Sequence, residues 1–148
     1  MVATLAPLDA HAAPPSTGGG TYQTVSTVLT GVRVAGNSGN SILTQTVTIG
    51  LTGTITGTSV CQETVVFLST EKGTFEAVCT FTGTVNGASG ASIRRFQGTF
   101  STPADSVEGQ VVIFNGAGGL AGLHGTGTFA GSAATGSGTY SVEFHLDP

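Results

Sequence analysis

Residues 114–129 have the sequence FNGAGGLAGLHGTGTF, in which six of the sixteen positions are glycine. An apolar segment ends at Phe114, and small residues alternate again from Gly125. Glycine is tolerated most easily where a chain turns tightly, kinks or lets another backbone come close. The stretch therefore predicts a strand, a glycine-rich corner and a second strand, as in a closed β-barrel.

The composition of the whole 148-residue chain favours the same fold class. Gly and Thr together make up about a third of the residues, and only 8% are charged. Threonine is β-branched and favours strands, whereas glycine weakens helices. The length suits one domain with a substantial core. We therefore predict an all-β fold.

Alternation of residue types between turn signals such as Asn86-Gly87 predicts eight strands. They span residues 21–34, 42–55, 59–69, 74–85, 92–101, 106–114, 125–130 and 138–146. Most connections are short, so consecutive strands should be antiparallel neighbours. Eight such strands can close on themselves and leave no exposed edge. We predict a single eight-stranded antiparallel β-barrel over residues 21–148, with a β-sandwich as the competing architecture.

Residues 1–20 resemble the remnant of an export leader. Ala10-His11-Ala12 has the small-x-small pattern of a signal-peptidase site, and a Pro- and Gly-rich segment follows it. The upstream part is short and lacks a basic start, so the beginning of the leader would be missing. The alternative is a disordered Ala/Pro tail. The leader predicts a secreted or extracytoplasmic protein, and a cytoplasmic location is the alternative.

The two cysteines, Cys61 and Cys79, flank a predicted turn near Thr70. In a hairpin centred there they would lie opposite one another, close enough for a disulfide. Such a bond requires an oxidising compartment and so agrees with export. The alternative is a pair of buried free thiols in a cytosolic barrel.

The charge pattern argues against nucleic acid and against a membrane span. The net charge is −4 with four basic residues, of which only Arg94 and Arg95 are adjacent. Adjacent residues of a strand point to opposite faces, so these two do not make a phosphate-binding patch. No apolar run approaches the roughly 20 residues that a membrane helix needs.

Three segments of the C-terminal half resemble a known bacterial family. They are residues 88–100, the glycine-rich residues 118–129 and residues 139–144. The chain is similar there to bacterial eight-stranded barrels of the allene oxide cyclase-like superfamily, which includes allene oxide cyclases, dirigent proteins and microbial polyketide cyclases. This resemblance implies a barrel whose lumen holds a hydrophobic molecule and shapes its folding. No catalytic motif of any member of the superfamily can be recognised in this chain.

Strand alternation places three polar residues on otherwise apolar, inward faces: Gln45, Glu63 and Arg94. Hairpin register puts Glu63 near Ala77 and Arg94 near Thr80 or Phe81, so the two charges could meet in the lumen. Glu63 would then act as a base or electrostatic stabiliser, and Arg94 would bind an oxygen. The alternative is a structural ion pair, or a charge in water at the barrel mouth.

The same alternation predicts the residues that contact a ligand. They are Gln45, Phe67, Phe81, Phe96, Phe100, Tyr140 and Phe144.

The apolar residues of the sixth strand lie on both faces, with Val111 and Ile113 on one and Val112 and Phe114 on the other. An apolar outer face predicts a homo-oligomer, most simply a dimer.

A second cluster, His124, Glu143 and His145, has ligand types that metals use. Glu143 and His145 alternate with apolar residues, so they should face solvent, and we expect no metal and no cofactor.

Three functions fit these expectations. The first is a cyclase or isomerase that holds a hydrophobic polyene, epoxide or polyketide-like substrate in a reactive shape. The others are a non-catalytic, lipocalin-like binder and a structural barrel with a filled lumen.

Overall fold

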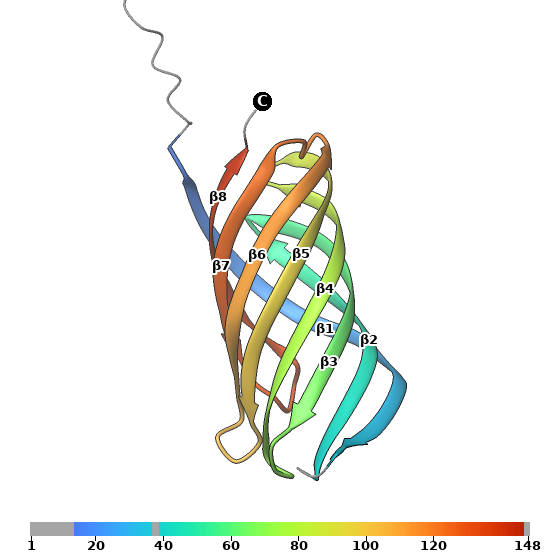
Figure 1. Ribbon diagram of the computed structural model, residues 1–148. Coiled ribbons are helices and arrows are strands. Elements are labelled where there is room, and N and C mark those ends of the chain that lie inside the picture. Colours follow the sequence, from blue (N-terminus) through green and yellow to red (C-terminus); the bar gives the residue numbers. More distant parts are fainter. Residues whose placement is uncertain (1–13, 37–38, 147–148) are drawn as a thin grey trace, which may run out of the picture.

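The computed structural model describes residues 14–36 and 39–146. The prediction of an all-β fold is confirmed, since eight antiparallel strands follow one another around a closed ring (Figure 1). The strands are β1 (Ser16–Ala35), β2 (Asn40–Gly53), β3 (Ile55–Phe67), β4 (Lys72–Val85), β5 (Ala88–Ser101), β6 (Ser106–Gly118), β7 (Leu123–Gly131) and β8 (Ser137–Leu146). The predicted leader site at Ala10-His11-Ala12 lies outside the described residues.

The glycine-rich stretch forms the β6–β7 connection, with one difference from the prediction. We expected the strand to end at Phe114, but β6 continues to Gly118. Asn115 adopts a left-handed φ of 52°, close to a register shift against β5, and this bulge lets the strand continue. A Cβ at Gly116 would collide with the backbone carbonyl of Leu120, so the tight turn requires glycine there.

The ring closes where the first half of β1 pairs with β8. Residues 16–23 pair with residues 137–144. The Tyr140 hydroxyl lies beside this seam, where it accepts a hydrogen bond from the Ile55 backbone N–H at 3.0 Å. It also lies within donor distance of the carbonyl oxygens of Thr52 (2.8 Å) and Ile55 (3.0 Å). One side chain of β8 thereby holds the turn between β2 and β3 from inside the ring.

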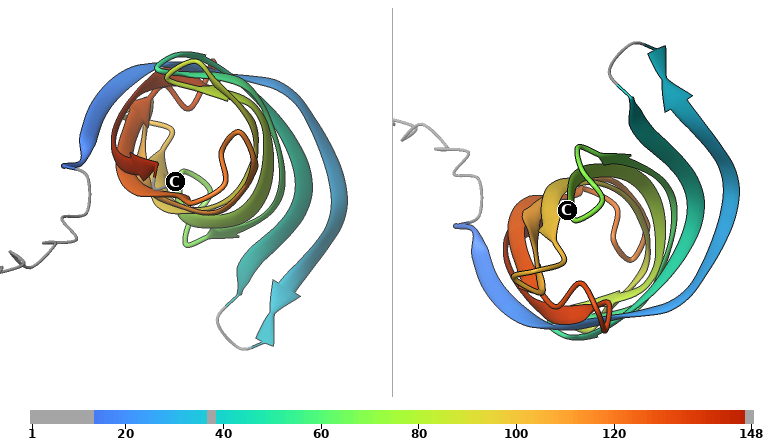
Figure 2. Two further views of the ribbon diagram at one scale, coloured as in Figure 1. Left: turned by 90° about the horizontal axis from the view of Figure 1, so that it is seen from above. Right: turned by 90° about the horizontal axis from the view of Figure 1, so that it is seen from below.

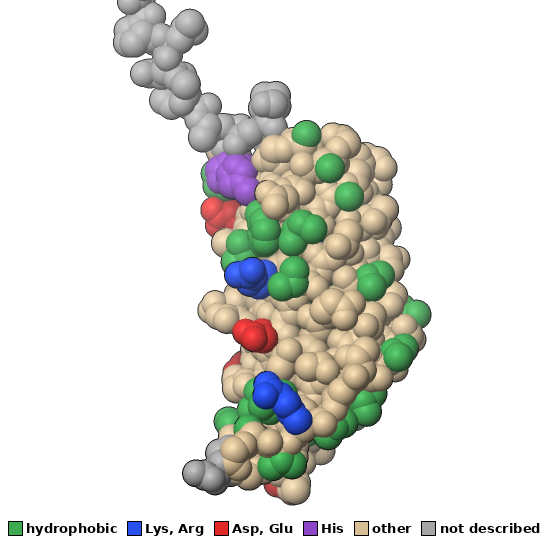
Figure 3. Space-filling view, turned by 45° about the vertical axis from the view of Figure 1, so that its right-hand side comes forward, with side chains coloured by type: hydrophobic (Ala, Val, Ile, Leu, Met, Phe, Trp, Pro, Cys, Tyr) green, Lys and Arg blue, Asp and Glu red, His purple; other side chains and the backbone are tan. Residues whose placement is uncertain are grey.

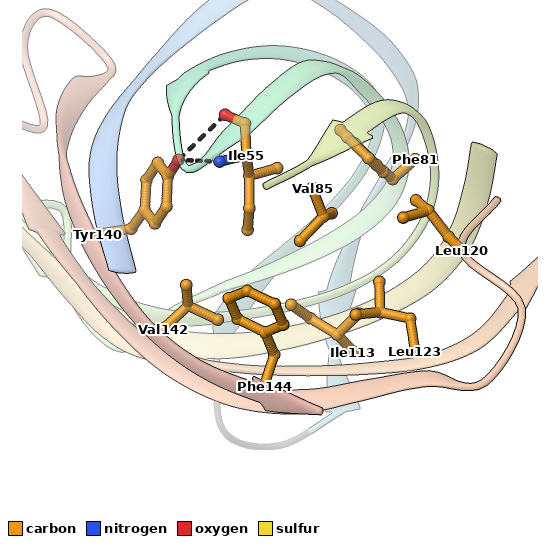
Figure 4. Packing of buried hydrophobic residues seen from close by; sticks show 9 residues of the cluster. All are labelled: Ile55, Phe81, Val85, Ile113, Leu120, Leu123, Tyr140, Val142 and Phe144. Atoms are coloured by element: carbon orange, nitrogen blue, oxygen red, sulfur yellow. Dashed lines mark hydrogen bonds between the residues drawn. The ribbon is translucent and has the colours of Figure 1, made fainter. Parts of the chain in front are cut away.

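Buried apolar side chains fill one end of the ring. The cluster comprises Ile55, Phe81, Val85, Ile113, Leu120, Leu123, Tyr140, Val142 and Phe144 (Figure 4). Leu120 and Leu123 come from the glycine-rich connection and are almost fully buried. This end carries the short β2–β3, β4–β5 and β6–β7 turns, including the predicted Asn86-Gly87 turn, where both residues have positive φ.

The second half of β1 leaves the ring. Beyond Gln23 it pairs with β2 but no longer with β8, and Figure 2 shows the β1–β2 hairpin extending past the circle of strands. Register shifts at Thr24/Ser26 and Leu29/Gly31 bend this strand. Its large apolar residues are exposed, with Leu29 at 56% and Val32 at 61%. The hairpin is therefore a flap that projects from the wall.

Cys61 and Cys79 lie opposite each other on β3 and β4 and form a disulfide, as the hairpin register predicts. Both side chains are buried inside the ring. Disulfides persist mainly in oxidising compartments, so the bond agrees with a location outside the reducing cytoplasm.

The outer surface carries few charges. Figure 3 shows a face of mostly backbone and uncharged polar side chains, on which Lys and Arg side chains stand apart. Val112 on the outer face of β6 is 48% exposed, so the dimer expected from this strand stays a prediction. Among the described residues no helix is long and apolar enough to cross a membrane.

We predict that Tyr140→Phe lowers the free energy of unfolding by about 1–3 kcal/mol, because it leaves the buried Ile55 N–H without an acceptor. Urea unfolding measures the loss. The control is Tyr22→Phe, since the buried Tyr22 hydroxyl has no hydrogen-bond partner among the described residues. Its removal should cost nothing, and equal losses in the two variants would contradict this account of the seam.

Candidate functional site

The half of the ring opposite the filled end is hollow. A cavity of about 370 Å³ lies there between the strands and reaches the β7–β8 loop at Ser132, Ala133 and Gly136. Its wall is mostly apolar and includes the disulfide at Cys79. Pockets of about 300–1,000 Å³ with a few placed polar groups are typical of small-molecule sites.

Aromatic rings form one side of this cavity. Phe96 packs edge-on against Phe75 at 5.9 Å and against Phe129 at 5.8 Å between ring centroids. Glycines on the neighbouring strands make room for these rings. A Cβ at Gly98 would lie 2.6 Å from Phe75, and one at Gly109 would lie 2.5 Å from Phe129. The inward glycines therefore let large rings lie flat against the wall without closing the cavity.

Arg94 projects from β5 into this apolar space and is 4% exposed. Its guanidinium carbon lies 3.8 Å from the centre of the Phe81 ring, a cation–π contact. Its Nε and Nη2 atoms are buried and have no hydrogen-bond partner among the described residues. Burial lowers the pKa of Arg94 to about 10, while the nearby Tyr140 hydroxyl opposes the shift. The side chain thus stays cationic at neutral pH.

Glu63 lines the same cavity from β3. It lies opposite Ala77, as predicted, and opposite Gln45 on its other side. The Gln45 side-chain amide donates a 2.6 Å hydrogen bond to Glu63 Oε1. Burial raises the pKa of the Glu63 carboxyl, and this hydrogen bond opposes the rise.

The predicted meeting of the two charges does not occur in this structure. Arg94 lies opposite Cys79, not opposite Thr80 or Phe81, which pair with Ile93 and Ser92. Glu63 and Arg94 therefore occupy adjacent rows of inward-facing residues, two strands apart, so their backbones are offset by about 10 Å across the strands and about 7 Å along them. The carboxylate is bound to Gln45, and the guanidinium extends over Phe81 instead.

The predicted ligand contacts divide into two groups. Gln45, Phe96 and Phe100 line the cavity, and Tyr140 lines it while also belonging to the filled end. Phe81 and Phe144 belong to the filled end, and Phe67 packs against Phe100 at 5.3 Å without lining the cavity. Alternation identifies the inward face correctly, but it does not tell how deep along the ring each side chain lies.

The polar residues of the cavity that sequence reasoning missed include Tyr22 and Ser59. The Ser59 hydroxyl is buried and, like that of Tyr22, has no hydrogen-bond partner in the described part of the chain. Ser59 stands in the alternating inward series with Cys61 and Glu63, which could have identified it. Tyr22 lies in the regular part of β1, before its register shifts, but no inward face was assigned to this strand.

The β7–β8 loop at the open end is held in place from two sides. The Asp105 carboxylate accepts hydrogen bonds from the Ser132 hydroxyl at 2.8 Å and from the Ala134 backbone N–H at 2.9 Å. These bonds lower the pKa of Asp105, the Ala134 bond most. The Thr24 backbone N–H donates to the Gly136 carbonyl at 2.9 Å. The rim of the cavity is therefore ordered.

The histidine cluster lies away from the cavity. His124 and His145 are opposite each other on β7 and β8, and their rings stack at 4.9 Å. Glu143 lies opposite Thr126 and is exposed. Within residues 14–36 and 39–146, no group of three or more His, Cys, Asp or Glu side chains is arranged to hold a metal ion.

Fold and site together define an all-β protein with a closed ring of strands, one filled end and one hollow end. The chain belongs to the family described as "Protein of unknown function (DUF3224)", whose model matches residues 19–145. A crystal structure of a DUF3224 protein of unknown function from Shewanella oneidensis MR-1 is similar, with a TM-score of 0.73 and 16% sequence identity. The match covers 90% of this chain and 99% of that one, and at this identity it bears on the fold alone.

No curated protein is significantly similar to this chain. The expected relation to the allene oxide cyclase-like superfamily is not confirmed by these comparisons and stays a prediction.

The raised pKa of Glu63 predicts a pH-dependent stability. Its usual pKa is 4.5, and the folded state favours the protonated form. The stability of the wild type relative to Glu63→Gln should be greatest below pH 4.5 and decline as the pH rises through the raised value. Urea unfolding of both proteins from pH 4 to pH 8 measures this difference. Glu76→Gln, on the exposed outer face of β4, is the matched control, and a constant difference for Glu63→Gln would contradict the prediction.

Proposed function

We propose that the closed ring works as a small barrel that binds a hydrophobic small molecule in its hollow half. The observation that carries this proposal is the 370 Å³ cavity with a largely apolar wall. An empty apolar space forfeits the packing contacts that a filled core would make. The other half of the same ring is filled tightly by Phe, Leu and Ile side chains. A ring that is filled in one half and open in the other is better suited to binding a ligand than to a purely structural role.

The size of the cavity limits the ligand. At about 30 Å³ for each water-sized group, 370 Å³ accommodates roughly a dozen non-hydrogen atoms. Part of a longer molecule could extend past the rim at residues 132–136. An unbranched ten-carbon chain is therefore a suitable first probe.

Blocking the cavity should weaken the binding of 1-decanol. Val111 faces the cavity and its neighbour Val112 faces outward, so Val111→Phe and Val112→Phe form a matched pair. We expect saturable binding by calorimetry to the wild type and to Val112→Phe, and a loss of at least tenfold in affinity for Val111→Phe. Absence of binding to the wild type, or equal binding by the two variants, would refute a lumenal site.

The position of Glu63 supports a second candidate, a cofactor-independent isomerase or cyclase as the superfamily resemblance implies. A general base needs a carboxylate in a water-poor site, with a pKa moved toward neutrality. Glu63 lines the cavity and its pKa is raised. Its carboxylate would take a proton from carbon next to a carbonyl, and Arg94 would stabilise the oxygen of the resulting enolate.

Exchange of carbon-bound hydrogen tests this candidate. In D2O, 2-decanone bound beside Glu63 should lose protons next to its carbonyl and gain deuterons from solvent, which mass spectrometry detects. Glu63→Gln should lower the rate about 100-fold while decanol still binds. If the protein binds 2-decanone but exchange is no faster than in buffer alone, the catalytic candidate is refuted and only the binding function stands.

We also propose that the protein works outside the cytoplasm. The Cys61–Cys79 disulfide and the leader-like pattern Ala10-His11-Ala12 support this location.

A further inference from the structure

The guanidinium of Arg94 is a buried cation with an unused edge. Its Nε and Nη2 atoms are both buried and without a hydrogen-bond partner among the described residues. A buried charged donor left unpaired is costly, and more costly than an unpaired neutral group. The contact with the Phe81 ring lies on the flat face of the guanidinium, so it satisfies neither N–H group.

These two atoms define the shape of what would complete the site. In arginine, the Nε–H and one Nη2–H lie parallel along one edge of the planar group. That edge matches the two oxygens of a carboxylate, which binds it through two parallel hydrogen bonds. A hydroxyl or a ketone offers one oxygen and can satisfy only one of the two donors at full strength.

The surroundings provide further polar contacts but no anion in position. Ser59 and Tyr22 line the same cavity, and each has a buried hydroxyl without a partner in the described chain. The nearest acidic side chain on the inward faces of β3–β5, Glu63, is held by Gln45. Arg94 therefore lines the cavity together with two buried hydroxyl groups, and its two unpartnered nitrogens lie just beneath the accessible surface of the wall.

We propose that the ligand is an aliphatic or polyene carboxylic acid whose carboxylate binds the Nε/Nη2 edge of Arg94. This inference rests on the proposed lumenal binding function and specifies its ligand class. The Ser59 hydroxyl donates to a carboxylate oxygen. The apolar tail runs past the aromatic wall of Phe96 and Phe129 toward the rim at residues 132–136.

The first test compares ligands of one length on the wild type. Decanoate, 1-decanol and methyl decanoate share the tail and differ at the polar end. Calorimetry at pH 7 should give a dissociation constant for decanoate about 10- to 100-fold lower than for the alcohol or the ester. Equal affinities would overturn the carboxylate proposal while leaving a lumenal binder. No binding by any of the three would overturn the binding function itself.

The second test identifies Arg94 as the origin of the preference. Arg94→Met removes the charge and keeps an unbranched apolar side chain, and the ratio of the alcohol and acid dissociation constants should fall close to one. Arg95→Met, at the exposed neighbouring position, should keep the wild-type ratio. A preference that survives in Arg94→Met would place the carboxylate elsewhere and overturn the proposal.

A third variant separates charge from shape. Arg94→Lys keeps a cation but lacks the two-donor edge, so its preference for decanoate should be intermediate. If Arg94→Met fails to fold, the Lys variant still decides the matter, because an undiminished ratio in it contradicts two-point recognition.

Discussion

The pairing of β1 with β8 is the constraint on which the rest of the structure depends. β1 is longer than the seam, so its residues 16–23 close the ring while its remainder continues with β2 alone. Tyr140 fixes the seam to the β2–β3 turn from within. Because the wall loses β1 beyond Gln23, the ring is complete around the filled end and interrupted beside the loop at residues 132–136. The location of the closure thus determines which half can admit a ligand.

The register of the strands then determines where the buried cation Arg94 lies. Antiparallel pairing puts Arg94 opposite Cys79, one row from the Glu63–Ala77 pair. A one-residue slip would send Arg94 to solvent and Arg95 inward, so the inward charge is a property of the whole sheet. The disulfide between β3 and β4 pins the β3–β4 register in the same row as Arg94. The cross-link therefore lies at the same depth in the wall as the backbone of Arg94.

Much of this arrangement could be predicted from the sequence, because strand alternation has a period of two and needs no tertiary information. Alternation correctly placed Gln45, Glu63 and Arg94 inside and paired the cysteines. It failed where two residues on one face differ in depth, as with Phe100 in the cavity wall and Phe144 in the filled end. It was not applied to β1, so Tyr22 was missed. Contacts of long side chains, such as Arg94 over Phe81, depend on rotamers that alternation does not determine.

The contrast between the two ends explains why a charge is tolerated inside so small a protein. At the filled end, every large side chain replaces water with packed carbon, which stabilises the fold. At the hollow end, small side chains at Ala77, Cys61 and Cys79 leave Arg94 room to lie over Phe81 while remaining charged. Arg94 is already buried with no hydrogen-bond partner for its Nε and Nη2 atoms among the described residues, and the proposed ligand would supply the missing acceptor. The folded state thus carries an unpaired cation whose cost falls when an anion binds, and binding should in turn stabilise the ring by mass action.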